Sequence, residues 1–121
     1  MGLNLNFSGV TAAGKFPVFE GDFNFIIQKA ELKPSKAGTS QNIHMTLECS
    51  DGPQQGETML AVQNVQESTM PFVKAFLNAV MNTELNGEID LDVDDLVGMT
   101  VGATVTNDGQ YNSVEVWYPA N

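Results

Sequence analysis

Few side chains in this 121-residue chain have the chemistry of a catalyst. His44 is the only histidine, so one copy can assemble neither a histidine-based triad nor a histidine metal cluster. Cys49 is the only cysteine, so no internal disulfide can form. It continues an apolar alternation that starts at Ile43, which predicts a buried thiol, while His44 falls on the opposite strand face and cannot activate it. We expect no catalytic residues and no enzymatic activity.

The carboxylates between residues 84 and 98 raise the possibility of a calcium site. Asp90, Asp92 and Asp94 have the spacing of the first ligands of an EF-hand loop. The sixth position would be Asp95 instead of glycine, and the twelfth would be Val101 instead of glutamate. No glycine motif that cradles phosphates is present either. We therefore expect no metal and no cofactor, and we interpret the run as a solvated acidic face.

Three lysines and two aromatic residues have the chemistry needed to bind a single nucleic-acid strand, which requires cations for phosphates and flat rings for bases. Lys29, Lys33 and Lys36 cluster at the end of one predicted strand and in the loop that follows it. Tyr111 and Trp117 share a phase on the last predicted strand. If the valines of the opposite phase are core, both rings face outward. Two alternatives stay open. In one the lysines only solvate a loop, and in the other Trp117 packs in the core.

The charge of the chain is strongly acidic. Fifteen acids face five lysines, and there is no arginine. Residues 1–60 carry a net charge of −2, whereas residues 61–121 carry one lysine and nine acids, a net charge of −8. Negative charge repels nucleic-acid phosphates and slows their encounter. Any nucleic-acid function must therefore use a local cationic surface.

The elements that would position these residues are mostly strands. Alternating apolar residues predict strands over 16–33, 42–49, 58–65, 99–106 and 111–118. In the first of these the phase changes near Lys29 and Ala30, which indicates a bulge or a bend. The residues Asn107, Asp108 and Gly109 predict a tight hairpin between the last two strands.

One segment has the period of a helix. Apolar residues from Phe72 to Val80 share a helical face, Ser68 or Thr69 can cap its start, and it ends near residues 82–83. After it we expect a brief extended piece and then one helical turn that is capped by Asp92 and closes at Gly98. Three strands, a helix and two strands, with a bent first strand, are the elements of a five-stranded OB barrel. We expect an all-β domain of this kind over residues 1–121, with residues 1–15 as an N-terminal arm lying across it.

Several short motifs follow one another over nearly the whole chain. They are Leu3-Asn4-Leu5-Asn6-Phe7, Gly21-Asp22-Phe23, Ile27-Gln28-Lys29-Ala30-Glu31, Lys33-Pro34-Ser35-Lys36-Ala37-Gly38, Asp51-Gly52-Pro53 with Gly56, Asp95-Leu96-Val97-Gly98, and Asn112-Ser113-Val114-Glu115-Val116-Trp117-Tyr118-Pro119-Ala120. No single motif is diagnostic, but their order resembles a family of short bacteriophage OB-fold single-stranded DNA-binding proteins. At Glu57 and Glu115 the chain is acidic where that family is commonly basic.

The resemblance implies a phage protein that binds single-stranded DNA during replication or recombination. Its contacts would be the three lysines, Tyr111 and Trp117. The alternative is an acidic phage interaction protein that mimics DNA and inhibits a basic, nucleic-acid-binding defence protein of the host. The partner would then bind the carboxylates of the acidic run, which are Glu84, Glu88, Asp90, Asp92, Asp94 and Asp95.

The expected compartment is the bacterial cytoplasm. No apolar stretch approaches the roughly 20 residues that cross a bilayer, so no membrane partner is expected. The opening residues lack the charged and apolar regions of a secretion signal. A single cysteine places no demand on an oxidising environment.

Overall fold

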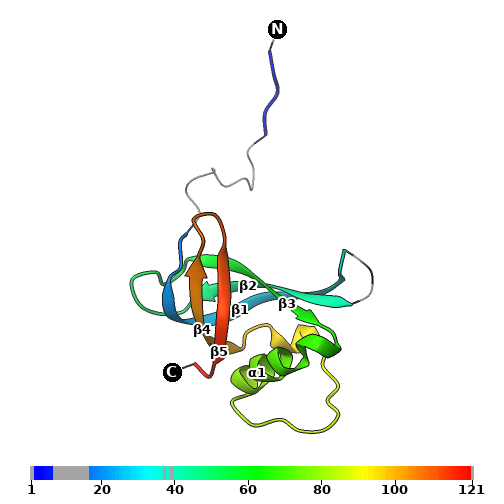
Figure 1. Cartoon of the computed structure of the whole chain (residues 1–121). Coiled ribbons are helices and arrows are strands. Elements are labelled where there is room, and N and C mark those ends of the chain that lie inside the picture. Colours follow the sequence, from blue (N-terminus) through cyan, green and yellow to red (C-terminus); the bar gives the residue numbers. More distant parts are fainter. Residues whose placement is uncertain (1, 7–16, 37, 39, 121) are drawn as a thin grey trace.

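The computed structural model describes residues 2–6, 17–36, 38 and 40–120. In these residues five antiparallel strands form one curled sheet in the order β3-β2-β1-β4-β5 (Figure 1). The two outer strands of this order, β3 and β5, approach each other, so the sheet curls into a half-barrel. A single α-helix, α1, lies between β3 and β4 in the chain. The all-β, OB-like fold expected from the sequence is confirmed.

The long strand β1 (Gly21–Pro34) holds the two halves of the barrel together. Its first half pairs with β4 (Thr100–Asn107) and its second half with β2 (Gln41–Cys49). The register shifts between Ile27 and Lys29, which leaves Gln28 as the extra residue of a β-bulge. Such a bulge bends the strand, and this bend lets β1 belong to both halves. The bend predicted near Lys29 and Ala30 is confirmed, and it lies at Gln28, just before these residues. The strand begins at Gly21, later than predicted, because residues 17–20 are not part of it. Phe16, the first residue of the predicted strand, lies outside the described residues.

Strict alternation determines β2 and its neighbour β3 (Thr58–Val65). Ile43, Met45, Leu47 and Cys49 are all buried, so the expected core position of the Cys49 thiol is confirmed. Both strands have the bounds that the periodicity predicted, apart from one residue at the start of β2. The turn between them contains Gly52 and Gly56, whose positive φ angles suit glycine.

The helix α1 (Met70–Met81) follows a single 3-10 turn, η1 (Glu67–Thr69), and packs its apolar face on the barrel. Pro71 occupies its first turn, Thr69 is its N-cap, and Asn82 ends it in the left-handed conformation with φ 52°. The Thr69 hydroxyl does not cap α1. It accepts a hydrogen bond from the Gln66 amide instead, at 3.0 Å. The predicted helix is confirmed, and the buried side of α1 contains Val73, Phe76, Leu77, Ala79 and Val80. Phe72, which the sequence placed on the same apolar face, is 63% exposed instead.

Residues 82–92 connect α1 to a second 3-10 turn, η2 (Val93–Leu96). The Asp92 carboxylate accepts a hydrogen bond from the Asp94 amide at 3.0 Å, so the predicted cap is confirmed. The Gly98 amide donates to the Ile27 carbonyl at 2.8 Å, which ties this turn to β1 beside the bulge. No strand forms over residues 89–93, although apolar residues alternate there, because no neighbouring strand pairs with them.

The strands β4 and β5 (Asn112–Tyr118) form the predicted hairpin. Here too the register shifts, between Thr104 and Val105 on β4, which leaves Glu115 of β5 as an extra residue. The barrel core lies between the sheet, α1 and η2, and Phe19, Phe25, Phe76 and Leu96 are fully buried in it. No helix of the described residues is long and apolar enough to cross a membrane.

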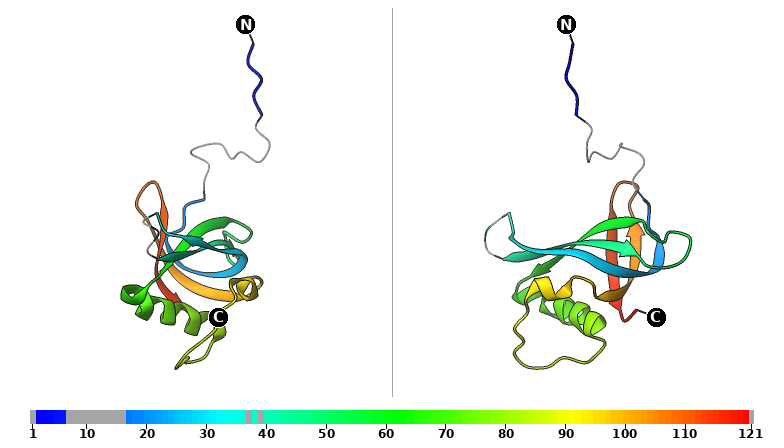
Figure 2. Two further views of the ribbon diagram at one scale, coloured as in Figure 1. Left: turned by 90° about the vertical axis from the view of Figure 1, so that its right-hand side faces the viewer. Right: turned by 180° about the vertical axis from the view of Figure 1, so that it is seen from behind.

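Residues 2–6 do not lie across the barrel. They are exposed and extend away from it, from the side opposite α1, as the views in Figures 1 and 2 agree. The remainder of the predicted arm, residues 7–15, lies outside the described residues.

Candidate nucleic-acid interface

The outer face of β1, β2 and β3 carries side chains that point away from the core. Strand pairing aligns them in rows across the sheet. The first row joins Lys29, Thr46 and Leu60, and the second joins Glu31, His44 and Val62. A third row joins Lys33, Asn42 and Asn64. We call these nine residues the outer face.

Two of the predicted lysines, Lys29 and Lys33, belong to the outer face, and Lys36 follows in the β1–β2 loop. All three are exposed. Lys33 forms an ion pair with Glu31 at 3.3 Å, and both side chains are more than half exposed. Such a surface pair is weak and is screened by salt, so it leaves the lysine available to a phosphate. The structure therefore brings the three lysines to one edge of this face.

Leu60 and Val62 make the β3 side of this face apolar. They are 74% and 55% exposed, although their neighbours Met59 and Ala61 are buried. Sequence reasoning missed them as site residues. The signal was present, because four consecutive apolar residues in a strand give it two apolar faces, and a barrel buries only one of them.

Tyr111 lies at the other edge of the face, just before β5, and is 64% exposed. Together with Leu60, Thr58 and Pro17 it borders a hollow of about 430 Å³. The Asp108 carboxylate holds the backbone here, since it accepts hydrogen bonds from the amides of Tyr111 at 2.7 Å and Gln110 at 2.9 Å. These two bonds, led by that of Tyr111, lower the pKa of Asp108.

Trp117 does not share the outward direction of Tyr111. Its ring packs edge-on against Phe76 of α1, with 4.8 Å between the ring centroids, and contacts the core. The expectation that both rings face outward is wrong because Glu115 is an extra residue in β5 and reverses the phase after it. Val116, which the alternation assigned to the core side, is 54% exposed instead. The core alternative for Trp117 is the one that the geometry supports.

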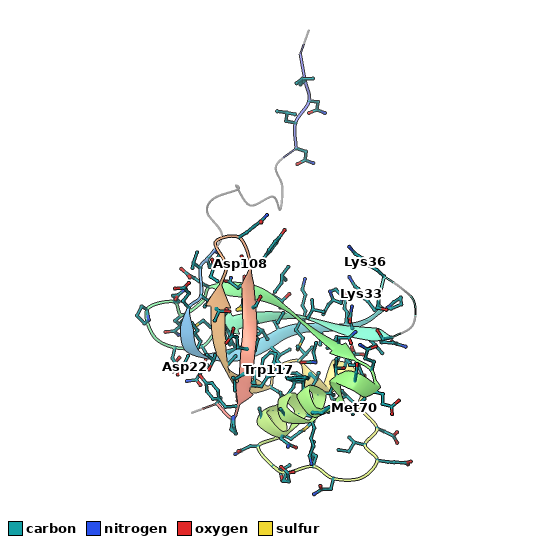
Figure 3. All side chains as sticks on the ribbon, in the orientation of Figure 1. Asp22, Lys33, Lys36, Met70, Asp108 and Trp117 are labelled. Carbon is teal, nitrogen blue, oxygen red and sulfur yellow. The ribbon has the colours of Figure 1, made fainter. Side chains whose placement is uncertain are left out.

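The acidic run lies on the other side of the molecule from the lysines. Residues 84–95 form the loop around α1, at the bottom of Figure 1, whereas Figure 3 shows Lys33 and Lys36 on the side of the sheet away from Met70 and α1. Within the loop, Glu84 forms an ion pair with Lys74 of α1 at 2.9 Å and accepts a hydrogen bond from Asn78 at 3.0 Å. The loop acids are exposed. Their distance from the outer face reduces the repulsion that a bound phosphate would experience there.

The outer face also contains local negative charge. Glu31 is one of its members, and Glu48 follows on β2, where its carboxylate accepts a hydrogen bond from Gln28 at 2.6 Å. The face can therefore offer cations along β1, polar side chains on β2, and apolar surface on β3 with one exposed ring beside it. In the described residues, no three His, Cys, Asp or Glu side chains lie close enough together to hold a metal ion.

Neither a protein-family model nor a curated protein matches this chain.

Proposed function

We propose that this chain is a bacteriophage single-stranded DNA-binding protein that acts in replication or recombination in the cytoplasm of the bacterial host. The supporting observation is the composition of the outer face, where Lys29 is in register with exposed Leu60, and the row of Lys33 is next to the row of exposed Val62. Single-strand binding by OB folds combines a cationic track for the backbone with flat or apolar surface for the bases. The phage role itself rests on the resemblance described above.

In this proposal the strand runs across β1, β2 and β3, between the β1–β2 loop and the β4–β5 hairpin. Lys29, Lys33 and Lys36 contact successive phosphates. A base stacks on Tyr111, and neighbouring bases lie against the two exposed aliphatic side chains. Trp117 packs on Phe76 of α1 and is not one of these contacts. Few phosphate contacts imply an affinity that depends weakly on salt.

The test is fluorescence anisotropy with labelled dT oligomers over a salt series. Three phosphate contacts to a single strand predict a log–log slope of about −2, at about −0.7 per contact. Changing Lys29, Lys33 and Lys36 to Glu should abolish binding because the track then repels phosphates. The matched control is Lys74→Glu, which reverses an exposed lysine of α1 and should leave the affinity within about twofold.

Two results would contradict the assignment. A slope near −5 would require about seven phosphate contacts, more than the five lysines of the chain can make. Equal losses in Lys74→Glu and in a single Lys33→Glu variant would show that net charge, and not the outer face, controls binding.

A second candidate function uses the acidic run. Its exposed carboxylates occupy one loop around α1 on the side opposite the lysines. A phage protein could present this loop to the nucleic-acid channel of a basic host defence protein. Dense carboxylates imitate the charge of a phosphate backbone, and such an interaction would weaken as salt rises.

A further inference from the structure

An apolar cavity of about 480 Å³ lies on the side of the barrel that carries α1. It is enclosed by the ends of β1, β2 and β3, by α1, and by residues 85–93. Most of its lining is aliphatic, including Leu32, Met70, Leu85, Ile89 and Leu91. Two of these, Met70 and Ile89, are 45% exposed at its rim. Lys74 also lines the cavity, and it is paired with Glu84. The other carboxylates of the acidic run are exposed beside the lining residues of the loop, so the border of this apolar surface is predominantly negative.

The N-terminal segment, residues 2–6, has the opposite character. It extends away from the barrel, and its two leucines, Leu3 and Leu5, are 85% and 63% exposed. Because they are separated by one residue, an extended backbone directs both to the same side, about 7 Å apart. No charged side chain occurs before Lys15. The molecule thus presents an exposed apolar segment on one side and an apolar cavity on the other. We call Leu3 and Leu5 the hook, and the cavity the socket.

We propose that Leu3 and Leu5 of one copy insert into this cavity of a second copy. The size is suitable, since an apolar cavity of about 150 Å³ already accepts a benzene-sized ligand. The charge is suitable as well. Two domains of net charge −10 repel each other, whereas a segment without acids can enter past the acidic border at no such cost.

The placement of the segment favours a second copy over the chain's own cavity. In all views of Figures 1 and 2 residues 2–6 lie beyond the end of the barrel opposite α1, whereas the cavity is bordered by α1. A hook on one side and a socket on the other make a head-to-tail contact, in which each copy uses both surfaces. Repeated contacts of this kind give rings or open chains.

This association should respond to salt in the opposite direction from DNA binding. Screening reduces the repulsion between acidic domains and leaves apolar burial intact, so self-association strengthens as salt rises. Binding of DNA through phosphate contacts weakens under the same change. The two proposals can therefore fail independently.

The experiment is sedimentation velocity and native mass spectrometry of the full chain over a concentration series. Leu3→Ser with Leu5→Ser should weaken self-association by about tenfold or more, since the variant loses the apolar surface that the two leucines would bury. Asn4→Ser, at a polar residue between the two leucines, is the control and should behave as wild type. On the socket side, Met70→Gln with Ile89→Asn should be as defective as the hook variant, and Val116→Thr, at an exposed valine of β5, is its control. Circular dichroism checks that each variant is folded.

Mixing the two defective variants gives the sharpest readout. The hook variant retains an intact socket, and the socket variant retains an intact hook. Each variant alone should therefore stay monomeric, and their mixture should form heterodimers and nothing larger. The proposal is overturned if the mixture stays monomeric, or if the hook variant associates as wild type does. It is also overturned if the wild-type protein is monomeric at all concentrations. In that case the cavity holds either a small apolar molecule or residues 2–6 of the same chain. A ligand would appear as added mass in the native spectrum, and an internal hook as a lower melting temperature of the hook variant.

Discussion

The aromatic ring of Tyr118 lies directly over Gly102 on the neighbouring strand, and a Cβ added at Gly102 would collide with that ring. The Tyr118 hydroxyl is within hydrogen-bond distance of the carbonyls of Phe23 and Ala103, at 3.4 and 3.3 Å. Burial of the ring raises the pKa of Tyr118. Glycine is thus required at position 102 because the Tyr118 ring approaches it closely, and not because the backbone needs a positive φ angle there.

Gly102→Ala should accordingly lower the free energy of unfolding by about 1–3 kcal/mol, the usual cost of overpacking. Urea denaturation would measure it. The matched control is a double-mutant cycle with Tyr118→Ala, in which removal of the ring should cancel most of the Gly102→Ala penalty. An unchanged penalty in that background would show that the ring is not its cause.

Tyr111 and Trp117 should separate binding from stability. Tyr111→Ala should weaken dT-oligomer binding by about 1–3 kcal/mol, because an exposed ring on which a base stacks contributes that much. Trp117→Ala should instead lower the free energy of unfolding by about 2 kcal/mol, somewhat less than a fully buried tryptophan, because its ring packs on Phe76. Anisotropy and thermal melts on both variants would measure the two effects. A stable Trp117→Ala variant with lost binding would return Trp117 to the DNA interface.

At the scale of the element, one carboxylate contributes two of the hydrogen bonds that hold the turn of the β4–β5 hairpin. Asp108 accepts hydrogen bonds from the amides of Tyr111 and Gln110, and these bonds lower its pKa. A carboxyl whose pKa is lower in the folded state stabilises that state above its ordinary pKa. The contribution is lost as the pH falls through the lowered value.

We therefore expect the order of this turn to decrease on acidification below about pH 4, the ordinary range for a carboxyl. Amide hydrogen exchange at Gln110 and Tyr111 would report it, as loss of protection. Asp108→Asn retains a neutral acceptor oxygen, so its exchange should show no such step once intrinsic pH effects are subtracted. A step of the same size in Asp108→Asn would assign the change to another group.

At the scale of the whole molecule, charge is separated between two sides. Asp90→Asn with Asp92→Asn and Asp94→Asn removes three negative charges and retains the cap of η2, since asparagine also caps. The melting temperature should stay equal or rise slightly, because repulsion within the loop decreases. Affinity for dT oligomers should rise modestly at low salt and converge on that of wild type at high salt.

The same triple variant tests the alternative function. If the acidic run binds a basic host protein, wild type should retain such a protein in a pull-down from host lysate at low salt and release it as salt rises. The triple variant should then lose it. Retention by the triple variant, or by a resin carrying wild type at high salt, would exclude the run as the contact.

The periodic elements could be read from the sequence because their signals are local. Alternation over β2 and β3, the helical spacing and flanking residues of α1, and the turn residues before β5 each depend on a few neighbouring side chains. The order of these elements was enough to predict the barrel. Burial of Cys49 followed from the same alternation.

Only the tertiary structure decided which side chains form the outer face. Periodicity assumes an unbroken repeat of two, and the extra residue Glu115 reverses it, so Trp117 turns inward and Val116 outward. Whether a bulge forms depends on the partner strand, which a single strand's pattern does not contain. Leu60 and Val62 share a face with the lysines only through the register of three strands. The acidic run lies away from this face because it surrounds α1, which closes the other side of the barrel. The bulge, the strand register and the position of the acidic run all involve residues that are far apart in the chain. Tertiary packing determines them, and local sequence preference does not.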